Sequence, residues 1–584
     1  STKTAPVHVS FSNLTYSVGL RTGGEKKILS NLHGVFAPGK LIALMGPSGS
    51  GKTTLMDILS GRKTIGRIEG EILYEGHKNV SAESLRKNTG YVEQFDTLIG
   101  ELTVRQMLMY TARLKLPSTP YASIVNIVDD VLARLALTDC QHTIIGSRLR
   151  RGISGGQAKR TNIALALIGT PSVLFLDEPT TGLDSHMANE VILFLQQLAR
   201  EEGRTVVAAV HSPSAFAFGL FDELLMLNQG RVIFSGSLDE DFASVRSCFG
   251  DQGFPFPAGQ GSRFSMVEWI VQITSGRTFA SHRGPHPHAA QAQRASEHDF
   301  AQGFVETGQQ KQLESLVKEV TDSLKLQAKD SPFEHLVKDD HTSSSENSCG
   351  VSGFLHSIRV LVAYRTSTKF RSGKFWGPRF GDKVMFSLLI LSLYWGIGGK
   401  DDVQSVASTA SLLYWVVAIC GYSASAFVPS LIEDRPVFYR ERADGLYSST
   451  CYTLSKVLEE ALACVLTSTV FTLVIFHGIA LQGSLWVFAL IYYLTSFCGI
   501  CIALAFASAM PNTSAATAAL PVYMTFCMFF GGLFLVFDKI PWGWKWFSYT
   551  TFIRYAWSSL MLNQFDSEEF LRGRQFEGKD VLTF

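Results

Sequence analysis

Charged side chains are scarce in this sequence and unevenly distributed. Asp, Glu, Lys and Arg make up 18% of the residues, against about 25% in typical soluble domains. Residues 461–537 contain none of the four. A stretch of this length without charge is typical of membrane-spanning helices, and it excludes a protein that is soluble throughout.

Net charge and cysteine content exclude two further classes. The formal net charge is +1, so there is no bulk electrostatic reason to expect nucleic acid as a partner. The nine cysteines of the 584 residues form no disulfide framework. A chain of this length is expected to contain several domains.

A glycine-rich loop lies between an apolar run at 41–45 and a helix-compatible run at 54–59. This order predicts the strand, loop and helix of a phosphate-binding loop. Its backbone N–H groups would surround phosphate oxygens, while Lys52 would reach the β- and γ-phosphates and Thr53 would ligate Mg²⁺. The residues predicted to bind ATP here are Gly46, Pro47, Ser48, Gly49, Ser50, Gly51, Lys52, Thr53 and Thr54.

Polar residues follow three further predicted strands. The apolar run at 173–176 ends in Asp177 and Glu178, which would hold Mg²⁺ through water and polarise the attacking water, respectively. The strand at 206–210 ends at His211, which could contact the γ-phosphate, and a short strand near 91 ends at Gln94, an oxygen donor for Mg²⁺. We predict Glu178, His211 and Gln94 as catalytic residues, and Thr53, Gln94 and Asp177 as the Mg²⁺ site.

Tyr16 lies in a predicted strand at 7–16. Its ring could stack on an adenine base, and we include it among the ATP-binding candidates. It could equally be an ordinary aromatic residue of a strand.

A Ser-Gly-Gly-Gln sequence at 154–157 precedes a helical run at 158–168, where a helix N-terminus could receive an anion. Together with the motifs above and Gly182-Leu183-Asp184, the Ser-Gly-Gly-Gln sequence completes a set of motifs. Residues 7–240, which contain this set, resemble the nucleotide-binding domain of ABC transporters. The resemblance implies two such domains that dimerise head to tail. The residues that would then contact the partner's nucleotide in trans are Ser154, Gly155, Gly156, Gln157 and Asp184.

Composition divides the chain into three parts. Residues 1–275 would form the ATPase domain, 276–350 a flexible linker with a short helix, and 351–584 a membrane domain. Residues 354–370 are basic and amphipathic, which favours a helix along the membrane interface. Five spans are predicted at 384–399, 403–430, 458–477, 485–509 and 516–537, followed by a re-entrant aromatic segment at 540–564.

Charges flank several of these spans. Lys383 and Lys400 border the short first span, and we expect their side chains to snorkel to the interfaces. The arginine-rich loop at 433–442 favours a cytosolic position by the positive-inside rule. Glu459 and Glu460 open the third span and could form a polar relay with Arg365 or Lys456, or could be solvated at the interface.

The chain as a whole resembles the G subfamily of ABC transporters. Four features carry this resemblance: the N-terminal position of the ATPase domain, Leu102-Thr103-Val104-Arg105, the arginine loop and Gly531-Gly532-Leu533-Phe534. This subfamily includes the white and breast-cancer-resistance half-transporters and the pleiotropic-drug-resistance proteins. The resemblance implies an α/β P-loop nucleotide-binding domain followed by an all-α polytopic transmembrane domain of the type-2 exporter-like, G-subfamily fold. Two departures are Gln157, where many members have Glu, and the sixth span, which we expect to be absent because the sequence ends in a polar segment after the fifth.

The resemblance also implies a function. We expect a half-transporter of the plasma membrane with a cytosolic ATPase domain, which pairs with a second half-transporter and exports a lipid, a sterol or a xenobiotic. Candidates for the cavity lining, with lipid-facing or core packing as the alternative, are Gly421, Tyr422, Met528, Leu533 and Phe534. An obligate heterodimer subunit and a membrane ATPase that regulates without pumping are the alternatives, although the intact Lys52, Glu178 and His211 argue against the second.

Overall fold

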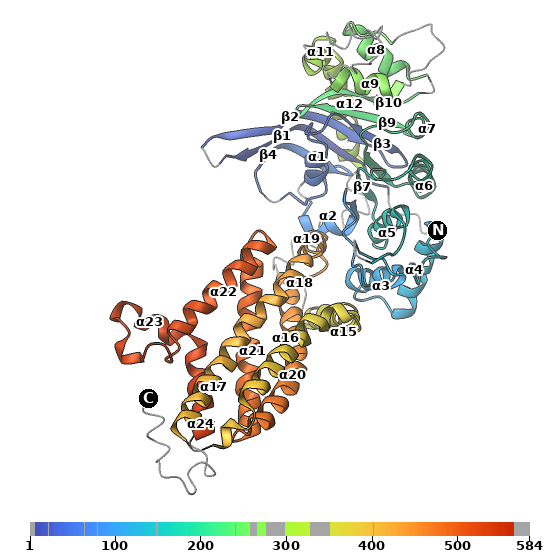
Figure 1. Cartoon of the computed structure of the whole chain (residues 1–584). Coiled ribbons are helices and arrows are strands. Elements are labelled where there is room, and N and C mark those ends of the chain that lie inside the picture. Colours follow the sequence, from blue (N-terminus) through green and yellow to red (C-terminus); the bar gives the residue numbers. More distant parts are fainter. Residues whose placement is uncertain are drawn as a thin grey trace, which may run out of the picture. The chain divides into compact units, whose positions relative to one another are not determined.

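The computed structural model describes residues 6–20, 23–63, 65–78, 80–147, 150–239, 241–256, 266–275, 298–327, 351–400 and 402–565. The chain divides into two compact units. The first, here called the α/β unit, comprises Ser1–Gly353 and Arg440–Leu446. The second, the helical unit, comprises Phe354–Tyr439 and Tyr447–Phe584. All the strands in Figure 1 belong to the first unit.

A six-stranded sheet forms the centre of the α/β unit. Its order is β10 (Arg231–Ser237), β9 (Glu223–Asn228), β3 (Leu41–Met45), β8 (Thr205–Ala209), β7 (Val173–Asp177) and β6 (Thr89–Val92). β3 pairs in parallel with β8 and β9, and β7 pairs in parallel with β6 and β8. All residues of β3, β7 and β8 are buried, as their uninterrupted apolar runs predict. The carboxyl ends of these strands therefore lie at one edge of the sheet, the usual place for a site in such folds.

The second sheet is antiparallel, in the order β2 (Glu25–Phe36), β1 (Val9–Gly19), β4 (Arg67–Tyr74) and β5 (His77–Lys78). Helix α12 (Gln309–Gln327) packs on β1 and β2, where the Thr321 hydroxyl lies 3.3 Å from that of Ser10. Helix α11 (Phe300–Glu306) packs on β10. These helices fall in the segment expected to be a linker, so the α/β unit extends beyond residue 275. The flanking parts of that segment, 276–297 and 328–350, lie outside the described residues.

Two helices of the α/β unit begin with a capping box, which satisfies backbone N–H groups at the helix N-terminus. These are α3 (Val104–Lys115), capped by Thr103 and Gln106, and α5 (Gly155–Leu167), capped by Ser154 and Gln157. α3 ends at Lys115, and the next helix, α4 (Tyr121–Arg134), begins after Pro120. The other helices of the α/β unit up to residue 275 are α1 (Lys52–Leu59), α2 (Ala82–Asn88), α4 (Tyr121–Arg134), α6 (Ser185–Glu202), α7 (Ala215–Phe218), α8 (Ala243–Asp251) and α9 (Met266–Ser275).

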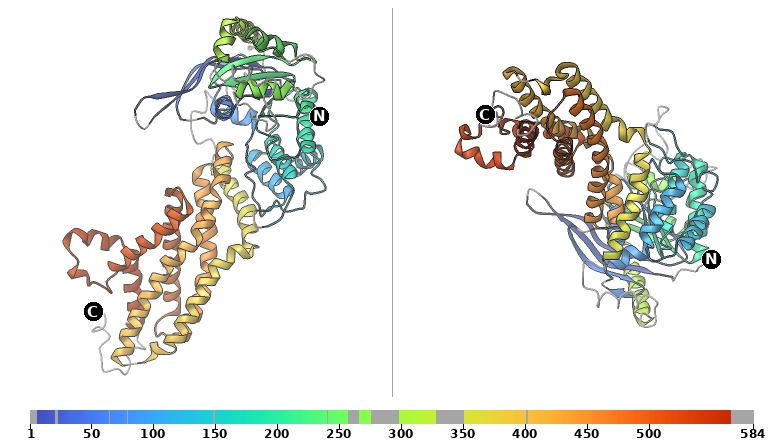
Figure 2. Two further views of the ribbon diagram at one scale, coloured as in Figure 1. Left: turned by 45° about the horizontal axis from the view of Figure 1, so that its top comes forward. Right: turned by 90° about the horizontal axis from the view of Figure 1, so that it is seen from below.

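The helical unit starts with α14 (Val351–Leu361), a π-helical turn (Val362–Thr366) and α15 (Ser367–Phe370), in the predicted amphipathic segment. Four long helices of this unit lie side by side in the views of Figures 1 and 2: α16 (Gly373–Tyr394), α17 (Val403–Ser423), α20 (Ser449–Ile479) and α21 (Leu485–Ala509). The shorter helices are α18 (Val428–Glu433), α19 (Arg435–Ala443), α22 (Thr513–Phe529), α23 (Trp542–Thr550) and α24 (Phe552–Phe565). Short 3₁₀ turns lie at Ile397–Gly399, Ala424–Phe427 and Phe537–Lys539.

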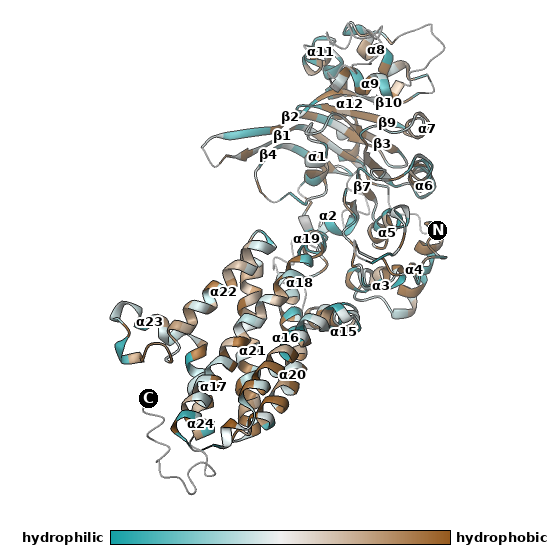
Figure 3. Ribbon diagram, in the orientation of Figure 1, coloured by the Kyte–Doolittle hydropathy of each residue, from teal (hydrophilic) through white to brown (hydrophobic). Residues whose placement is uncertain are grey.

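Three helical segments in the described part of the chain are long and apolar enough to cross a membrane: Val403–Glu433, Ser449–Ile479 and Leu485–Ala509. α20 and α21 are largely brown in the hydropathy colours of Figure 3. The other two expected spans differ from the prediction. The first expected span, 384–399, is the C-terminal part of α16 followed by a 3₁₀ turn, and the fifth, 516–537, ends as a helix at Phe529.

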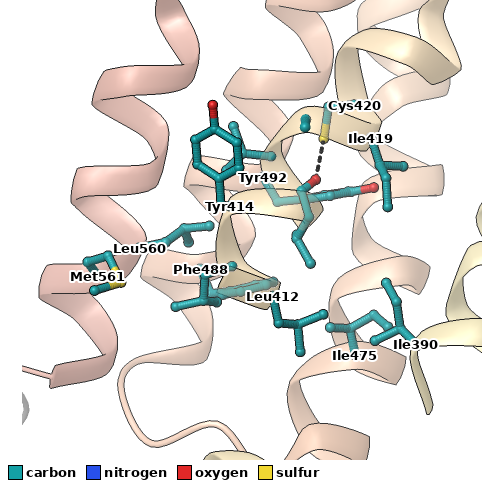
Figure 4. Close-up of a cluster of buried hydrophobic side chains, with 14 of the residues drawn as sticks. Ile390, Leu412, Tyr414, Ile419, Cys420, Ile475, Phe488, Tyr492, Leu560 and Met561 are labelled. Atoms are coloured by element: carbon teal, nitrogen blue, oxygen red, sulfur yellow. Dashed lines mark hydrogen bonds between the residues drawn. The ribbon is translucent and has the colours of Figure 1, made fainter. Parts of the chain in front are cut away.

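A buried cluster holds the helical unit together (Figure 4). Tyr414 of α17, Phe488 and Tyr492 of α21 and Leu560 of α24 are each at most 1% exposed. The aromatic segment predicted at 540–564 thus forms two helices, α23 and α24, and the second contributes to this core.

Candidate functional site

The phosphate-binding loop follows β3 and requires glycine at three positions. Gly46, Gly49 and Gly51 have φ angles of 148°, 79° and 103°, a region that residues with a Cβ rarely adopt. A Cβ on Gly46 would lie 2.1 Å from the carbonyl oxygen of Leu227. The loop is therefore shaped by backbone constraints and leads directly into α1 at Lys52.

Two polar groups of this loop are available to an anion. The Lys52 ammonium is buried and donates to the carbonyl oxygens of Gly46, at 2.8 Å, and Pro47, at 3.1 Å. Burial lowers the pKa of Lys52, although the nearby Glu178 and Asp177 carboxylates act in the opposite direction. The Ser50 hydroxyl is buried without a hydrogen-bond partner among the described residues. A phosphate would offer acceptors to both groups, so the loop fits the predicted ligand.

The Mg²⁺ ligands predicted from two distant motifs meet at the end of β7. The Thr53 hydroxyl donates to Asp177 Oδ2 at 2.9 Å. Burial raises the pKa of Asp177, the bond from Thr53 lowers it, and the neighbouring Glu178 carboxylate raises it further. A hydroxyl and a carboxylate are hard oxygen donors of the kind that Mg²⁺ prefers. The pair therefore fits the predicted ion.

Glu178, the predicted general base, is held by two side chains. The amide of Gln94 donates to Glu178 Oε2 at 2.8 Å, and the Thr181 hydroxyl donates to the same oxygen at 2.9 Å. Glu178 has a φ of 47°, a strained conformation for a residue with a Cβ. Thr181, which no motif of the sequence indicates, is therefore a further residue of the site.

The remaining predicted residues lie at strand and helix ends. His211 is exposed, just after β8. Asp184 caps α6 by accepting from the N–H of Met187 at 3.0 Å, and Gln157 accepts from the N–H of Ser154 at 2.9 Å. Asp184 and Gln157, both predicted to contact the partner's nucleotide, thus cap the N-termini of α6 and α5, respectively.

The predicted trans-acting glycines differ from each other in their surroundings. Gly155 is exposed, and nothing lies within 4 Å of the position that a Cβ would occupy. Gly156 is buried, and a Cβ there would lie 2.2 Å from the side chain of Met187. Gly155 is therefore the one of the two that is open to a ligand, as is the exposed Ser154.

The adenine-stacking role predicted for Tyr16 is wrong. Its side chain is 1% exposed, and its hydroxyl donates to the carbonyl oxygen of Ile65 at 2.6 Å. A Cβ on Gly66 would lie 2.6 Å from the ring. Since the ring is enclosed, the second interpretation, an ordinary strand aromatic, is the correct one.

The loop after β6 receives contacts that sequence reasoning missed. Arg62, which follows α1, donates to Glu93 at 3.2 Å, lies 4.1 Å from the centre of the Tyr91 ring and pairs with Asp444. Asp444 belongs to the segment Arg440–Leu446, which clusters with the α/β unit. In the same segment Glu441 is fully buried and accepts from the Tyr110 hydroxyl at 3.0 Å. The arginine-rich loop predicts a cytosolic position from the sequence, but no local sequence pattern indicates that Asp444 pairs with Arg62 or that Glu441 accepts from Tyr110.

Two of the residues predicted to line a substrate cavity are packed in the interior of the helical unit. A Cβ on Gly421 would lie 2.5 Å from the Met524 sulfur, and Met528 is 7% exposed within the buried cluster. For these two, core packing is the correct alternative. Tyr422 and Leu533 are partly buried, and Phe534 is 56% exposed.

The charged residues at the start of α20 are buried and paired. Glu459 accepts from the Thr366 hydroxyl at 2.9 Å and lies 3.2 Å from the Lys456 ammonium. Glu460 pairs with Arg379 of α16, whose Nε donates at 3.2 Å. Lys383, expected to snorkel, is 7% exposed and donates to the Tyr492 hydroxyl at 2.9 Å. The snorkelling prediction is therefore wrong for Lys383, whereas Lys400 is exposed. Of the two alternatives for Glu459, the polar relay with Lys456 is the one that the structure shows.

Two family profiles match the chain. The one described as "ABC transporter" matches residues 29–181, and the one described as "ABC-2 type transporter" matches residues 356–565. "ABC transporter G family member 18" of Arabidopsis thaliana is 28% identical over 99% of this chain and 81% of its own length. The relatives that the chain matches are members of the G family, and the two profiles, which together match more than half of the chain, place it among the ABC transporters. Its α/β unit contains the ATPase domain of that family, and its helical unit contains the membrane domain.

Two other G-family proteins show how much of a relative the chain spans. "ABC transporter G family member 3" of Dictyostelium discoideum is 31% identical over 96% of this chain but only 39% of its own length. The bovine "Broad substrate specificity ATP-binding cassette transporter ABCG2" is 29% identical over 97% of this chain and 85% of its own length. The chain thus spans less than half of one of these ABC transporters and most of the other.

Proposed function

We propose that this chain is an ATP-hydrolysing half-transporter that works with a second half-transporter and exports hydrophobic or amphipathic molecules. One observation carries the proposal: the Thr53–Asp177 and Gln94–Glu178 hydrogen bonds bring the predicted metal-binding and water-activating groups to one sheet edge. A protein that merely bound nucleotide would need no such base beside its phosphate loop.

The side chains have distinct parts in hydrolysis. Lys52 and the glycine loop bind and orient the β- and γ-phosphates. Thr53 and Asp177 hold Mg²⁺, which when bound neutralises phosphate charge. Glu178 accepts the proton of the attacking water, with Gln94 and Thr181 fixing its carboxylate through the two bonds above. His211 remains our candidate for a γ-phosphate contact.

The nucleotide site is proposed to need two chains. Ser154 and Gly155 are exposed at the N-terminus of α5, which leaves their polar groups available to the nucleotide of another ATPase domain. Two half-transporters arranged head to tail would each complete the other's site. The second chain is either another copy of this chain or a related half-transporter.

The substrate is proposed to bind beside the helical unit, in contact with the exposed Phe534 and the partly buried Tyr422 and Leu533. Their apolar and aromatic surfaces favour a lipid, a sterol or a xenobiotic. We place the transporter in the plasma membrane with its ATPase domain in the cytosol.

The test is the ATPase rate of the full-length protein in lipid vesicles, with and without a panel of sterols, phospholipids and amphipathic drugs. Glu178→Gln should lower the rate about 10²–10⁴-fold, because a general base contributes that much. The matched control is Glu190→Gln, since Glu190 is an exposed carboxylate of α6 outside the site, and it should keep the wild-type rate.

Three outcomes would count against parts of the proposal. Undiminished hydrolysis by Glu178→Gln would overturn the catalytic assignment. Hydrolysis only after a second half-transporter is added would exclude the homodimer. Hydrolysis that no member of the panel stimulates would contradict the substrate class.

A further inference from the structure

Lys159 of α5 is a buried charge that the proposed hydrolysis steps do not use. It is 1% exposed, and its ammonium donates to the carbonyl oxygen of Gln94 at 2.9 Å. The same ammonium lies 3.5 Å from the carbonyl oxygen of Glu93 and 3.1 Å from Asp96 Oδ1. Three acceptors of one loop thus converge on a single lysine from another element.

A second side chain of the same helix strengthens the attachment. The Asn162 amide donates to Asp96 Oδ1 at 3.1 Å. Burying an ammonium is costly unless it is paired and hydrogen-bonded. The position is therefore built to hold the loop against α5, and an apolar residue could fill the space without making these bonds.

The two ends of this connection both belong to the proposed nucleotide sites. α5 begins at the exposed Ser154 and Gly155, which we propose to meet the partner's nucleotide. The loop carries Gln94, whose amide donates to Glu178 beside the chain's own nucleotide. Ser154 and Asp96 also line one open pocket, of about 500 Å³. A displacement of α5 would therefore be passed to Gln94 through Lys159.

We propose that Lys159 is a positioning residue, which couples contact of α5 with the partner's nucleotide to the placement of Gln94 and Glu178 in its own site. The proposal rests on the proposed function. Lys159 itself touches neither nucleotide. It acts by keeping the Gln94 loop and the N-terminal half of α5 as one body.

A matched control is a lysine of α3 that contacts the same helix, α5. The Lys115 ammonium donates to the carbonyl oxygen of Leu165, near the C-terminal end of α5 and outside the Gln94 loop. Lys115→Met removes a lysine contact with α5 as Lys159→Met does, but it leaves the proposed coupling intact. A merely structural role for the lysine contacts of α5 predicts the same result for both variants.

The experiment measures ATP hydrolysis by the full-length wild type, Lys159→Met and Lys115→Met in vesicles, together with thermal unfolding. Lys159→Met should lower kcat about tenfold, with the KM for ATP changed less than about twofold, because ground-state binding by the phosphate loop is intact. Its Hill coefficient for ATP should fall toward one, since the two sites no longer communicate. Lys115→Met should lower the unfolding temperature but keep kcat and the Hill coefficient.

Contrary results are distinguishable. Lys159→Met with wild-type kcat and Hill coefficient, or both lysine variants with equal losses, would overturn the inference and leave the proposed function standing. A wild type that hydrolyses no ATP would overturn the proposed function as well. If Lys159→Met fails to fold, Asp96→Asn replaces it: this change should lower kcat about threefold, and an unchanged kcat would overturn the inference.

Discussion

Two ion pairs of this ABC transporter, one from each unit, lie in opposite surroundings. In the α/β unit the pair between Lys87 and Glu83 has side chains that are 68% and 57% exposed. In the helical unit the pair between Arg379 and Glu460 has side chains that are only 5% and 2% exposed. Water can solvate the first pair, whereas the second depends wholly on its own hydrogen bonds. Ion pairs of the same residue types are thus marginal where they are exposed and structurally essential where they are buried.

The difference explains how a sequence so poor in charge can still use charge in its membrane domain. Residues 461–537 carry none of the four charged residue types, but Lys456, Glu459 and Glu460 lie just before them in α20 and are all buried. In an apolar bundle a charge is tolerated where a partner on a neighbouring helix meets it. Arg379 of α16 and Thr366 of the preceding turn are such partners.

The largest effect on stability is expected for the buried pair of the helical unit, Arg379 and Glu460. Arg379→Met should lower the free energy of unfolding by about 3–5 kcal/mol, because it leaves the Glu460 carboxylate buried without its partner. Thermal unfolding in detergent, followed by loss of monodisperse protein, measures the effect. The double variant Arg379→Met, Glu460→Gln is the control and should recover most of the loss. A single variant as stable as the wild type would contradict the account.

A buried but uncharged position of the α/β unit should give an intermediate effect. Tyr16→Leu removes the hydrogen bond to Ile65 and part of the enclosed ring. We expect a loss of about 1–3 kcal/mol in unfolding free energy and an unchanged KM for ATP. Equilibrium denaturation and ATPase kinetics check the two parts separately. A tenfold higher KM at unchanged stability would reinstate the adenine-stacking role.

The smallest effect is expected for the exposed pair. Lys87→Met removes the partner of Glu83 one turn away on α2 and should change stability by no more than about 0.5 kcal/mol. Because water screens this pair, added salt should reduce even that difference. Denaturation at low and high salt measures it. A loss comparable to that of Arg379→Met would remove the distinction between the exposed and the buried pair.

The sequence predicted the α/β site well because parallel strands impose its geometry. Residues that follow β3 and β7 must lie at the same sheet edge, so Thr53 and Asp177 could be expected to meet. Gln94 joins them because it follows β6, the neighbour of β7. Lys159 and Arg62 could not be predicted, since their partners depend on how α5 and the end of α1 pack against the loop after β6.

Predictions that depended on exposure were less successful. Tyr16 and Gly421 were assigned ligand contacts from residue type, but Gly66 and Met524, both far away in the sequence, cover them. Lys383 was expected to reach an interface, because its position beside an uncharged run indicated a span boundary. Tyr492, on another helix, gives it a partner in the interior instead. Periodicity and spacing contain no information about such contacts.

The most direct test of the central claim, that each nucleotide site is completed by two chains, mixes two inactive variants. Lys52→Ala disables the phosphate loop, and Gly155→Asp places a negative charge at the exposed start of α5, where nothing within 4 Å opposes the new side chain. Each variant alone should hydrolyse almost no ATP.

Co-expressed from two differently tagged copies, the two variants should recover ATP hydrolysis up to about a quarter of the wild-type rate, because random pairing gives half mixed dimers with one intact site each. The rate should fall below this limit if the coupling through Lys159 operates, because the chain that supplies Glu178 to the intact site carries the altered α5. Mixed dimers isolated by their two tags that hydrolyse no more ATP than either variant alone, with an active wild type, would contradict the account.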